Sequence, residues 1–217
     1  MVSASVSLSV TVPSDGAGLL GDLDLPAAAR GVVLFAHGSG SSRLSPRNRA
    51  VAAALRGTGF GTLLLDLLTE EEEREDAVTD RHRFDIGLLA RRLAHALDWL
   101  ERRPDTADLP VGLFGASTGA GAALVTAAEH PRRVSAVVSR GGRPDLAGDA
   151  LERVACPVLL VVGGDDETVL GLNREAAGRL SAAHRVHVVP GATHLFPEPG
   201  ALEQVAGLAA DWFRGHL

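Results

Sequence analysis

The sequence contains no lysine and no tyrosine, and all 21 of its basic residues are arginine. Without a lysine amine, the chain cannot form a Schiff base or supply the lysine of a Walker A phosphate loop. The Tyr-Lys pair of short-chain dehydrogenases is excluded for the same reason. Three large classes of enzyme chemistry can therefore be set aside.

Cysteine is almost absent. Cys156 is the one cysteine, which excludes an internal disulfide. No group of cysteine and histidine residues has the spacing of a zinc site, so we expect no metal and no cofactor. Because Cys156 leads into an apolar run, we interpret it as a small buried residue.

Long apolar runs are also missing. No stretch approaches the 18 apolar residues that a membrane-spanning helix needs. The first ten residues lack the charged start and apolar centre of a signal peptide, and their apolar positions alternate as in a strand. We expect a cytoplasmic protein with no membrane partner.

There is no surplus of positive charge. The formal net charge is −6, and residues 70–80 carry seven acidic side chains against Arg74, which accounts for the whole imbalance. Such a chain has no electrostatic footprint for nucleic acid. We interpret the acidic run as a solvated loop.

The chain alternates apolar strands with helical patterns over its full length. This alternation predicts an α/β fold with a mostly parallel sheet and helices on both faces. A length of 217 residues suits a single domain spanning 1–217, and no linker interrupts it. An antiparallel edge hairpin is predicted at 2–12 and 19–25. Further strands are predicted at 31–36, 61–67, 111–114, 134–139, 157–162 and 185–189, and helices at 47–56, 84–103, 117–129, 146–153, 170–180 and 201–213.

A glycine-flanked serine motif within residues 111–121 is the feature on which the functional interpretation depends. Residues 111–121 run from an apolar strand through Gly115-Ala116-Ser117-Thr118-Gly119 into an alanine-rich helix. A serine exposed at a sharp strand-to-helix turn needs small neighbours two residues away on each side, which Gly115 and Gly119 provide. We therefore interpret Ser117 as a catalytic nucleophile.

Polar residues follow the other predicted strands at the edge where parallel sheets bind ligands. A serine nucleophile needs a histidine base, and that histidine needs a carboxylate to orient it. His194 and Asp166 follow Ser117 in the order nucleophile, acid, histidine. Asp165 is the alternative acid. His37 is interpreted as a buttress of its own loop.

With these residues the sequence resembles the α/β-hydrolase superfamily, and most closely its compact dienelactone-hydrolase-like members. The motifs that carry the resemblance are His37-Gly38-Ser39-Gly40, Gly115–Gly119, Gly163-x-x-Asp166-x-x-Val169 and Pro190–Phe196. The resemblance implies an α/β-hydrolase fold without a large cap domain, because only residues 140–156 separate the strands where caps are usually inserted. It also implies an oxyanion hole formed by the backbone amides of Ser39 and Thr118.

The resemblance has one departure. Dienelactone hydrolases proper carry cysteine as nucleophile, whereas this chain carries Ser117, which favours a general hydrolase of small esters or thioesters over the lactone hydrolase. Arg140 is a candidate for holding a substrate carboxylate, whereas the simpler interpretation is that it and Arg143 pair with acids. A pocket bounded by residues 68–83 is predicted to favour small, soluble acyl groups.

Two alternatives lie outside hydrolysis. The same fold can serve as a non-catalytic binding protein, because a fold does not fix a function. The stretch 37–42, His-Gly-Ser-Gly-Ser-Ser, could instead cradle a phosphate or nucleotide, although it lacks lysine. The sequence leaves the oligomeric state open, a homodimer included.

Overall fold

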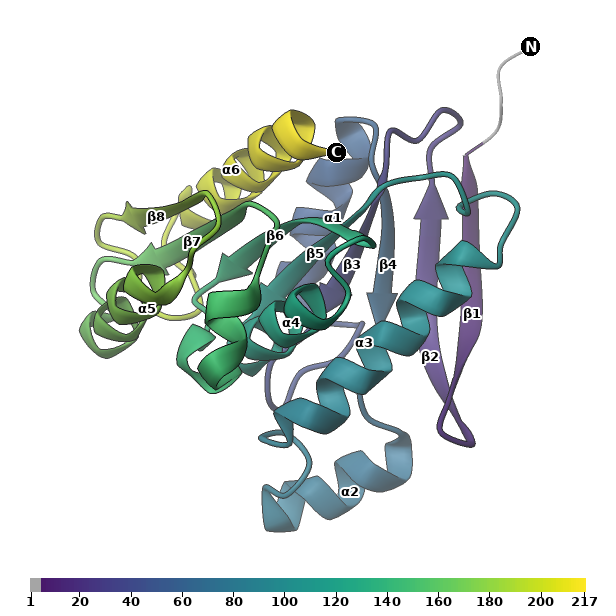
Figure 1. Ribbon diagram of the computed structural model, residues 1–217, viewed down its shortest axis with the longest axis horizontal. Coiled ribbons are helices and arrows are strands. Elements are labelled where there is room, and N and C mark those ends of the chain that lie inside the picture. The colour runs from purple at the N-terminus through teal and green to yellow at the C-terminus, as the bar shows by residue number, and fades with distance from the viewer. Residues whose placement is uncertain (1–4) are drawn as a thin grey trace.

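The computed structural model describes residues 5–217, which are built around one sheet of eight strands (Figure 1). The strands lie in the order β1-β2-β4-β3-β5-β6-β7-β8. β2 is antiparallel to both β1 and β4, and every other neighbouring pair is parallel. Their bounds are β1 Val6–Ser14, β2 Ala17–Leu25, β3 Val32–Ala36, β4 Gly61–Leu65, β5 Val111–Ala116, β6 Val134–Arg140, β7 Val158–Gly163 and β8 His184–Val189. The predicted mostly parallel sheet is confirmed.

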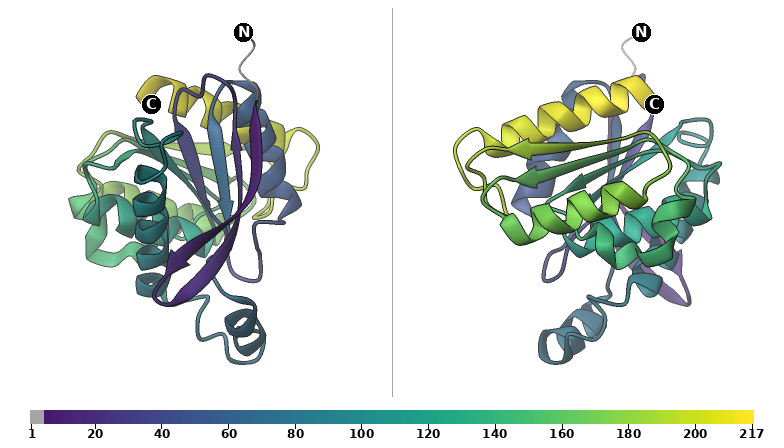
Figure 2. Two further views of the ribbon diagram at one scale, coloured as in Figure 1. Left: turned by 90° about the vertical axis from the view of Figure 1, so that its right-hand side faces the viewer. Right: turned by 60° about the vertical axis from the view of Figure 1, so that its left-hand side comes forward.

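Helices cover both faces of the sheet. α1 and α6 pack against each other on one face, and α3, α4 and α5 lie on the other, as the right-hand view of Figure 2 shows for α6 and α5. Their bounds are α1 Pro46–Gly57, α2 Glu70–Thr79, α3 Ile86–Glu101, α4 Thr118–Glu129, α5 Glu167–Arg179 and α6 Ala201–His216, with a 3-10 segment, η1, at Pro144–Arg153.

This layering explains why the inner strands are apolar throughout. Every residue of β3, β4, β5 and β7 is buried, because helices cover both of their faces. One core lies under α3 and α4, and the other lies under α1 and α6. Polar side chains that follow these strands therefore collect at the carboxyl edge of the sheet.

The predicted edge hairpin is present, with β1 paired to β2 over its whole length. The strand was expected from Val2, and residues 1–4 lie outside the described part of the chain. From Val10 onward the burial of β1 alternates, and β2 buries Leu19, Gly21, Leu23 and Leu25 while Leu20, Asp22 and Asp24 are more exposed.

The expectation of a loop at residues 70–80 is wrong, because this segment forms helix α2. A capping box starts it: the Thr69 hydroxyl accepts from the Glu72 N–H, and the Glu72 carboxylate accepts from the Thr69 N–H. Four glutamates fill the first turn, where the positive end of the helix dipole favours negative charge. The acidic residues therefore form a helix, which their charge at its N-terminus stabilises, and they do not form the expected solvated loop.

The segment 140–156 contains only η1, so the expected absence of a large cap domain agrees with the observed chain. α2 instead projects beyond the carboxyl ends of the strands (Figure 1). Among residues 5–217, we find no helix with the length and apolar character needed to cross a bilayer.

Candidate active site

Ser117 occupies the turn between β5 and α4. Its backbone adopts φ 50° and ψ −124°, a conformation that side-chain-bearing residues rarely adopt. The turn places Ser117 directly beyond the end of a central strand, as the motif predicts.

The surrounding glycines make this turn sterically possible. A Cβ on Gly115 would lie 2.4 Å from the Ala120 Cα, and a Cβ on Gly119 would lie 2.3 Å from the Ala36 carbonyl oxygen. A Cβ on Gly38 would lie 2.8 Å from the Ser117 Cβ. All three positions lack the space that any side chain would need.

His194 and Asp166 come together from the loops after β8 and β7. The His194 Nδ1 atom lies 2.7 Å from Asp166 Oδ2. Because an ionised carboxylate only accepts hydrogen bonds, Nδ1 carries the proton and Nε2 is left able to act as a base. Asp166 makes this contact, whereas Asp165 is exposed and does not.

Ser117 and His194 lie on either side of the end of β6. The Ser117 N–H donates to the Arg140 carbonyl over 3.3 Å, and a Cβ on the following Gly141 would lie 3.6 Å from His194 Nδ1. Within residues 5–217, no hydrogen bond joins the Ser117 hydroxyl to His194. The structure therefore pairs His194 with Asp166 directly and places Ser117 at the neighbouring strand end.

Ser39 and Thr118 are also adjacent, but they bind each other. The Ser39 N–H donates to Thr118 Oγ1 over 3.1 Å, and the two hydroxyl groups lie 3.1 Å apart. The contact joins the loop after β3 to the first residue of α4. A ligand that binds the Ser39 amide must displace the Thr118 hydroxyl.

His37 supports this loop, as its sequence position predicts. The Leu67 N–H donates to His37 Nε2 over 2.9 Å, so Nδ1 carries the proton and lies 3.0 Å from the Gly38 carbonyl oxygen. Burial lowers the pKa of His37. A neutral imidazole with both nitrogens occupied holds the loop and is not available as a base.

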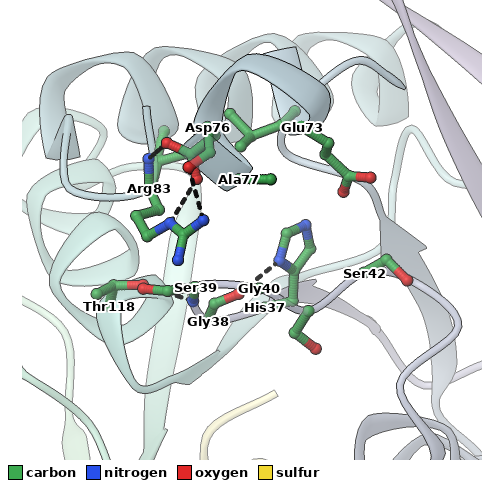
Figure 3. Close-up of a pocket in the computed structure, with 13 residues that line it drawn as sticks. His37, Gly38, Ser39, Gly40, Ser42, Glu73, Asp76, Ala77, Arg83 and Thr118 are labelled. Atoms are coloured by element: carbon green, nitrogen blue, oxygen red, sulfur yellow. Dashed lines mark hydrogen bonds and ion pairs between the residues drawn. The ribbon is translucent and has the colours of Figure 1, made fainter. Parts of the chain in front are cut away.

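A cavity of about 270 Å³ opens between this loop and α2 (Figure 3). Ser39, Gly38 and Thr118 line its floor, and Asp76, Ala77 and Glu73 face it from α2. Apolar surface comes from Leu68 and Leu89. The predicted pocket bounded by residues 68–83 is present and reaches the Ser39–Thr118 contact.

Charged groups line the α2 side of this cavity. Arg83 Nε lies 2.5 Å from Asp76 Oδ2. Burial alone would raise the pKa of Asp76, but hydrogen bonds from the Arg83 backbone and guanidinium lower it. Burial, together with repulsion from Asp66 and Glu70, raises the pKa of Glu73.

A second charge pair fastens α2 to α3. The Arg92 guanidinium binds both Glu72 carboxylate oxygens, at 2.7 and 2.5 Å, and also the Leu67 carbonyl. Burial opposes ionisation of Glu72, but the hydrogen bond from Arg92 prevails, and the pKa of Glu72 falls to about 2. Two arginine–carboxylate pairs, each with one buried partner, thus hold α2 over the cavity.

Arg140 ends β6 and is almost fully buried. Its Nη2 atom lies 3.4 Å from Asn48 Oδ1 on α1, and it makes no ion pair within residues 5–217. Arg143, by contrast, pairs with Asp145 at 2.7 Å. Of the two arginines considered from sequence, only Arg143 pairs with an acid.

The structure also shows the surroundings of Cys156, which we interpret from the sequence as a small buried residue. Cys156 is buried, and burial raises its pKa to about 11, so a thiolate is disfavoured. Over residues 5–217, no three His, Cys, Asp or Glu side chains gather closely enough to hold a metal ion.

Sequence reasoning missed the side chains that α2 contributes. Glu73 and Asp76 belong to the acidic run, which was interpreted as a surface loop. The signal that could have identified the helix is Thr69-Glu-Glu-Glu72, a capping-box pattern.

The strand order and the serine turn together define an α/β hydrolase fold. The model of the dienelactone hydrolase family matches residues 19–213. The chain belongs to this family, and its structural neighbours include hydrolases and esterases.

Two curated relatives come from Mycobacterium tuberculosis strains CDC 1551 / Oshkosh and H37Rv, and each bears the name "putative phosphoribosyl transferase". Each is 62% identical over 197 residues, which are 91% of this chain but 44% of the relative. The chain therefore spans less than half the length of these relatives.

A solved structure of a dienelactone hydrolase from Anabaena variabilis is 56% identical, with a TM-score of 0.96, and the match covers 98% of this chain and 99% of the other. Est1E from Butyrivibrio proteoclasticus matches with a TM-score of 0.80 at 16% identity, over 95% and 98% of the two chains. The second likeness concerns the fold alone.

Proposed function

We propose that this protein is a serine hydrolase that cleaves small carboxylic esters or thioesters by two-step acyl transfer. Ser117 is the nucleophile, His194 the base and Asp166 the acid that orients it. The contact of 2.7 Å between His194 and Asp166, at a strand end beside the strained Ser117 turn, carries the proposal. It supplies a base with a fixed tautomer near the half-buried Ser117 side chain.

In the first step, His194 Nε2 takes the Ser117 hydroxyl proton while Oγ attacks the substrate carbonyl carbon. The bond to the leaving group breaks, and His194 returns the proton to that group. In the second step, water gives a proton to His194 and attacks the acyl carbon. The acyl–Oγ bond breaks, and Ser117 recovers its proton.

The negative oxygen that forms in each step needs donors, and the backbone amides of Ser39 and Thr118 are the candidates. Support comes from their adjacency at the floor of the cavity. For Ser39 to take part, its N–H exchanges the Thr118 hydroxyl for the substrate oxygen. Losing one such donor typically costs about 3 kcal/mol of transition-state stabilisation.

The cavity under α2 is the proposed site for the acyl chain. Its volume of about 270 Å³ suits a short chain, and Glu73 and the Asp76–Arg83 pair make its α2 side polar. We therefore expect acetyl and butyryl esters to react faster than octanoyl esters.

A lactone is the second candidate substrate, and the similarity to a dienelactone hydrolase structure favours it. Lactone opening uses the same attack by Ser117, with the leaving oxygen still tethered to the acyl group. The expected partner is in either case a small molecule. The cytoplasmic location and the absence of nucleic-acid and membrane partners remain expectations from sequence.

The proposal is tested with p-nitrophenyl acetate, butyrate and octanoate. We expect turnover that falls with chain length, and a loss of at least about 10³-fold in Ser117→Ala. Ser135→Ala, on the same sheet but at the other end of β6, is the control that should leave turnover unchanged. Wild-type turnover in Ser117→Ala would reject the assignment. No turnover of any ester by the wild-type protein would favour the non-catalytic alternative.

A further inference from the structure

Arg140 is a buried positive charge that has no negative partner among residues 5–217. It is 6% exposed, and its Nε and Nη1 atoms have no hydrogen-bond partner within the described residues. A guanidinium carries five N–H donors, and here the Asn48 side-chain oxygen, 3.4 Å away, is the one acceptor that meets them. Leaving a charge buried in this way is costly unless another group compensates it.

The groups around Arg140 add positive charge. Asn48 is the third residue of α1, and Arg47 precedes it. The first turn of α1 contains no acidic side chain, and the backbone amides of that turn carry the positive end of the helix dipole. Burial, and then repulsion from Arg47, lowers the pKa of Arg140 to about 10, so it is still charged at neutral pH.

Nearby arginines show that the chain pairs such charges elsewhere. Arg49, in the same turn of α1, lies 3.0 Å from Asp22, and Arg43 lies 2.5 Å from Asp66. Arg47 forms no ion pair within residues 5–217, and its Nε atom is buried without a partner. Arg140 on β6 and Arg47 on α1, which lie close enough to repel each other, are thus both left without a carboxylate among the described residues.

We infer that Arg140 and Arg47, beside the N-terminus of α1, bind an oxyanion group, a carboxylate or a phosphate, carried by the substrate. As a statement about substrate, this inference rests on the proposed function. The Arg140 carbonyl accepts the Ser117 N–H, so the site adjoins the nucleophile. Arg47 is half-buried, so it is the part of this site that solvent reaches. Substrate therefore lies across Ser117, between this site and the cavity under α2.

The first experiment needs no catalysis and uses the thermal unfolding of the whole protein. Inorganic phosphate and succinate, each compared with chloride at matched ionic strength, separate the two kinds of oxyanion. At twentyfold excess over its dissociation constant, a bound anion should raise the Tm of the wild type by roughly 4 to 7 °C. Arg140→Met should lose this rise while unfolding at the same or a higher Tm without anion, because it removes an unpaired buried charge.

Arg47→Gln is the second variant, and it decides the matter if Arg140→Met does not fold. It should reduce the rise in Tm, whereas the control Arg49→Gln, which removes an equal charge two residues away, should retain it. Two results would overturn the inference. One is a wild-type Tm that phosphate and succinate leave at its chloride value. The other is an equal rise in Arg140→Met, Arg47→Gln and Arg49→Gln.

The second experiment links the site to substrate. The ratio of kcat/KM for p-nitrophenyl hemisuccinate to that for its neutral methyl ester should fall at least tenfold in Arg140→Met and stay unchanged in Arg49→Gln. An unchanged ratio in Arg140→Met would remove substrate binding from the site while the proposed hydrolase stands. If the wild type hydrolyses neither ester, the proposed function fails, and the Tm measurements still decide whether an oxyanion binds.

Discussion

The strained turn at Ser117 can be measured by replacing the residue with glycine and with alanine. Both replacements remove the hydroxyl, and both should abolish ester hydrolysis. They differ in the backbone, because alanine must keep φ at 50° with a Cβ present, whereas glycine adopts this conformation without steric cost. The difference in stability between the two variants therefore reports the strain.

A residue held in such a sparsely populated conformation costs about 1 to 3 kcal/mol. Glycine offsets part of this gain, because it loses about 0.4 to 1 kcal/mol more conformational free energy on folding than alanine. It also gives up the contact that a Cβ at position 117 makes with the loop at Gly38. We therefore expect Ser117→Gly to be about 1 kcal/mol more stable than Ser117→Ala, which corresponds to roughly 2 to 4 °C in Tm.

Urea and thermal unfolding of the two variants supply the measurement, with equal m-values showing that the unfolded states are comparable. At an unstrained strand or helix position, glycine would be the less stable variant by about 0.5 to 1 kcal/mol. A Ser117→Gly protein that is less stable than Ser117→Ala by this unstrained amount would therefore refute the claim that the turn stores strain.

Three further predictions concern the orienting acid, the motif glycine and the roof of the cavity. Asp166→Asn should lower kcat/KM about 10³- to 10⁴-fold while the exposed neighbour variant Asp165→Asn stays within about twofold, and similar losses in both would remove Asp166 from its role. Gly119→Ala, whose Cβ would meet a backbone carbonyl at 2.3 Å, should cost roughly 3 kcal/mol or more in urea unfolding, whereas Gly171→Ala in open space on α5 should gain about 0.5 to 1 kcal/mol. Equal effects of the two substitutions would contradict the packing argument. The folded pKa of Glu72 is about 2, below its ordinary 4.5, so its contribution is complete above pH 4.5 and is lost as pH falls toward 2. Amide exchange should show α2 losing protection relative to α3 over this range, and parallel loss in both helices would count against this pair as the fastening of α2.

The features that could be predicted from sequence depend on local pattern or on general rules of sheet geometry. The Gly115–Gly119 motif fixes a tight turn through sterics alone. Parallel strands bring their carboxyl ends to one edge, which is why residues as distant as Asp166 and His194 could be expected to meet. The acid–histidine contact then follows from chain order without knowledge of any side-chain packing.

The features that sequence did not predict depend on partners far away in the chain. The net charge of residues 70–80 predicts a solvated loop, whereas the structure of this segment is decided by a cap at Thr69 and by Arg92 on another helix. The engagement of the Ser39 amide by the Thr118 hydroxyl joins two loops that no periodicity connects. The burial of Arg140 near Arg47 likewise depends on tertiary structure. The sequence around position 140 does not show whether an acidic side chain lies close to Arg140 in the folded protein.

The central claim is that Ser117 is the nucleophile of an acyl-transfer site. The most direct measurement is labelling of the wild-type protein with a fluorophosphonate, followed by mass spectrometry of its peptides. We predict one added phosphonyl group, located on Ser117, and a large loss of labelling rate in His194→Ala. Labelling at another residue, or equal labelling of a Ser117→Ala protein, would contradict the account.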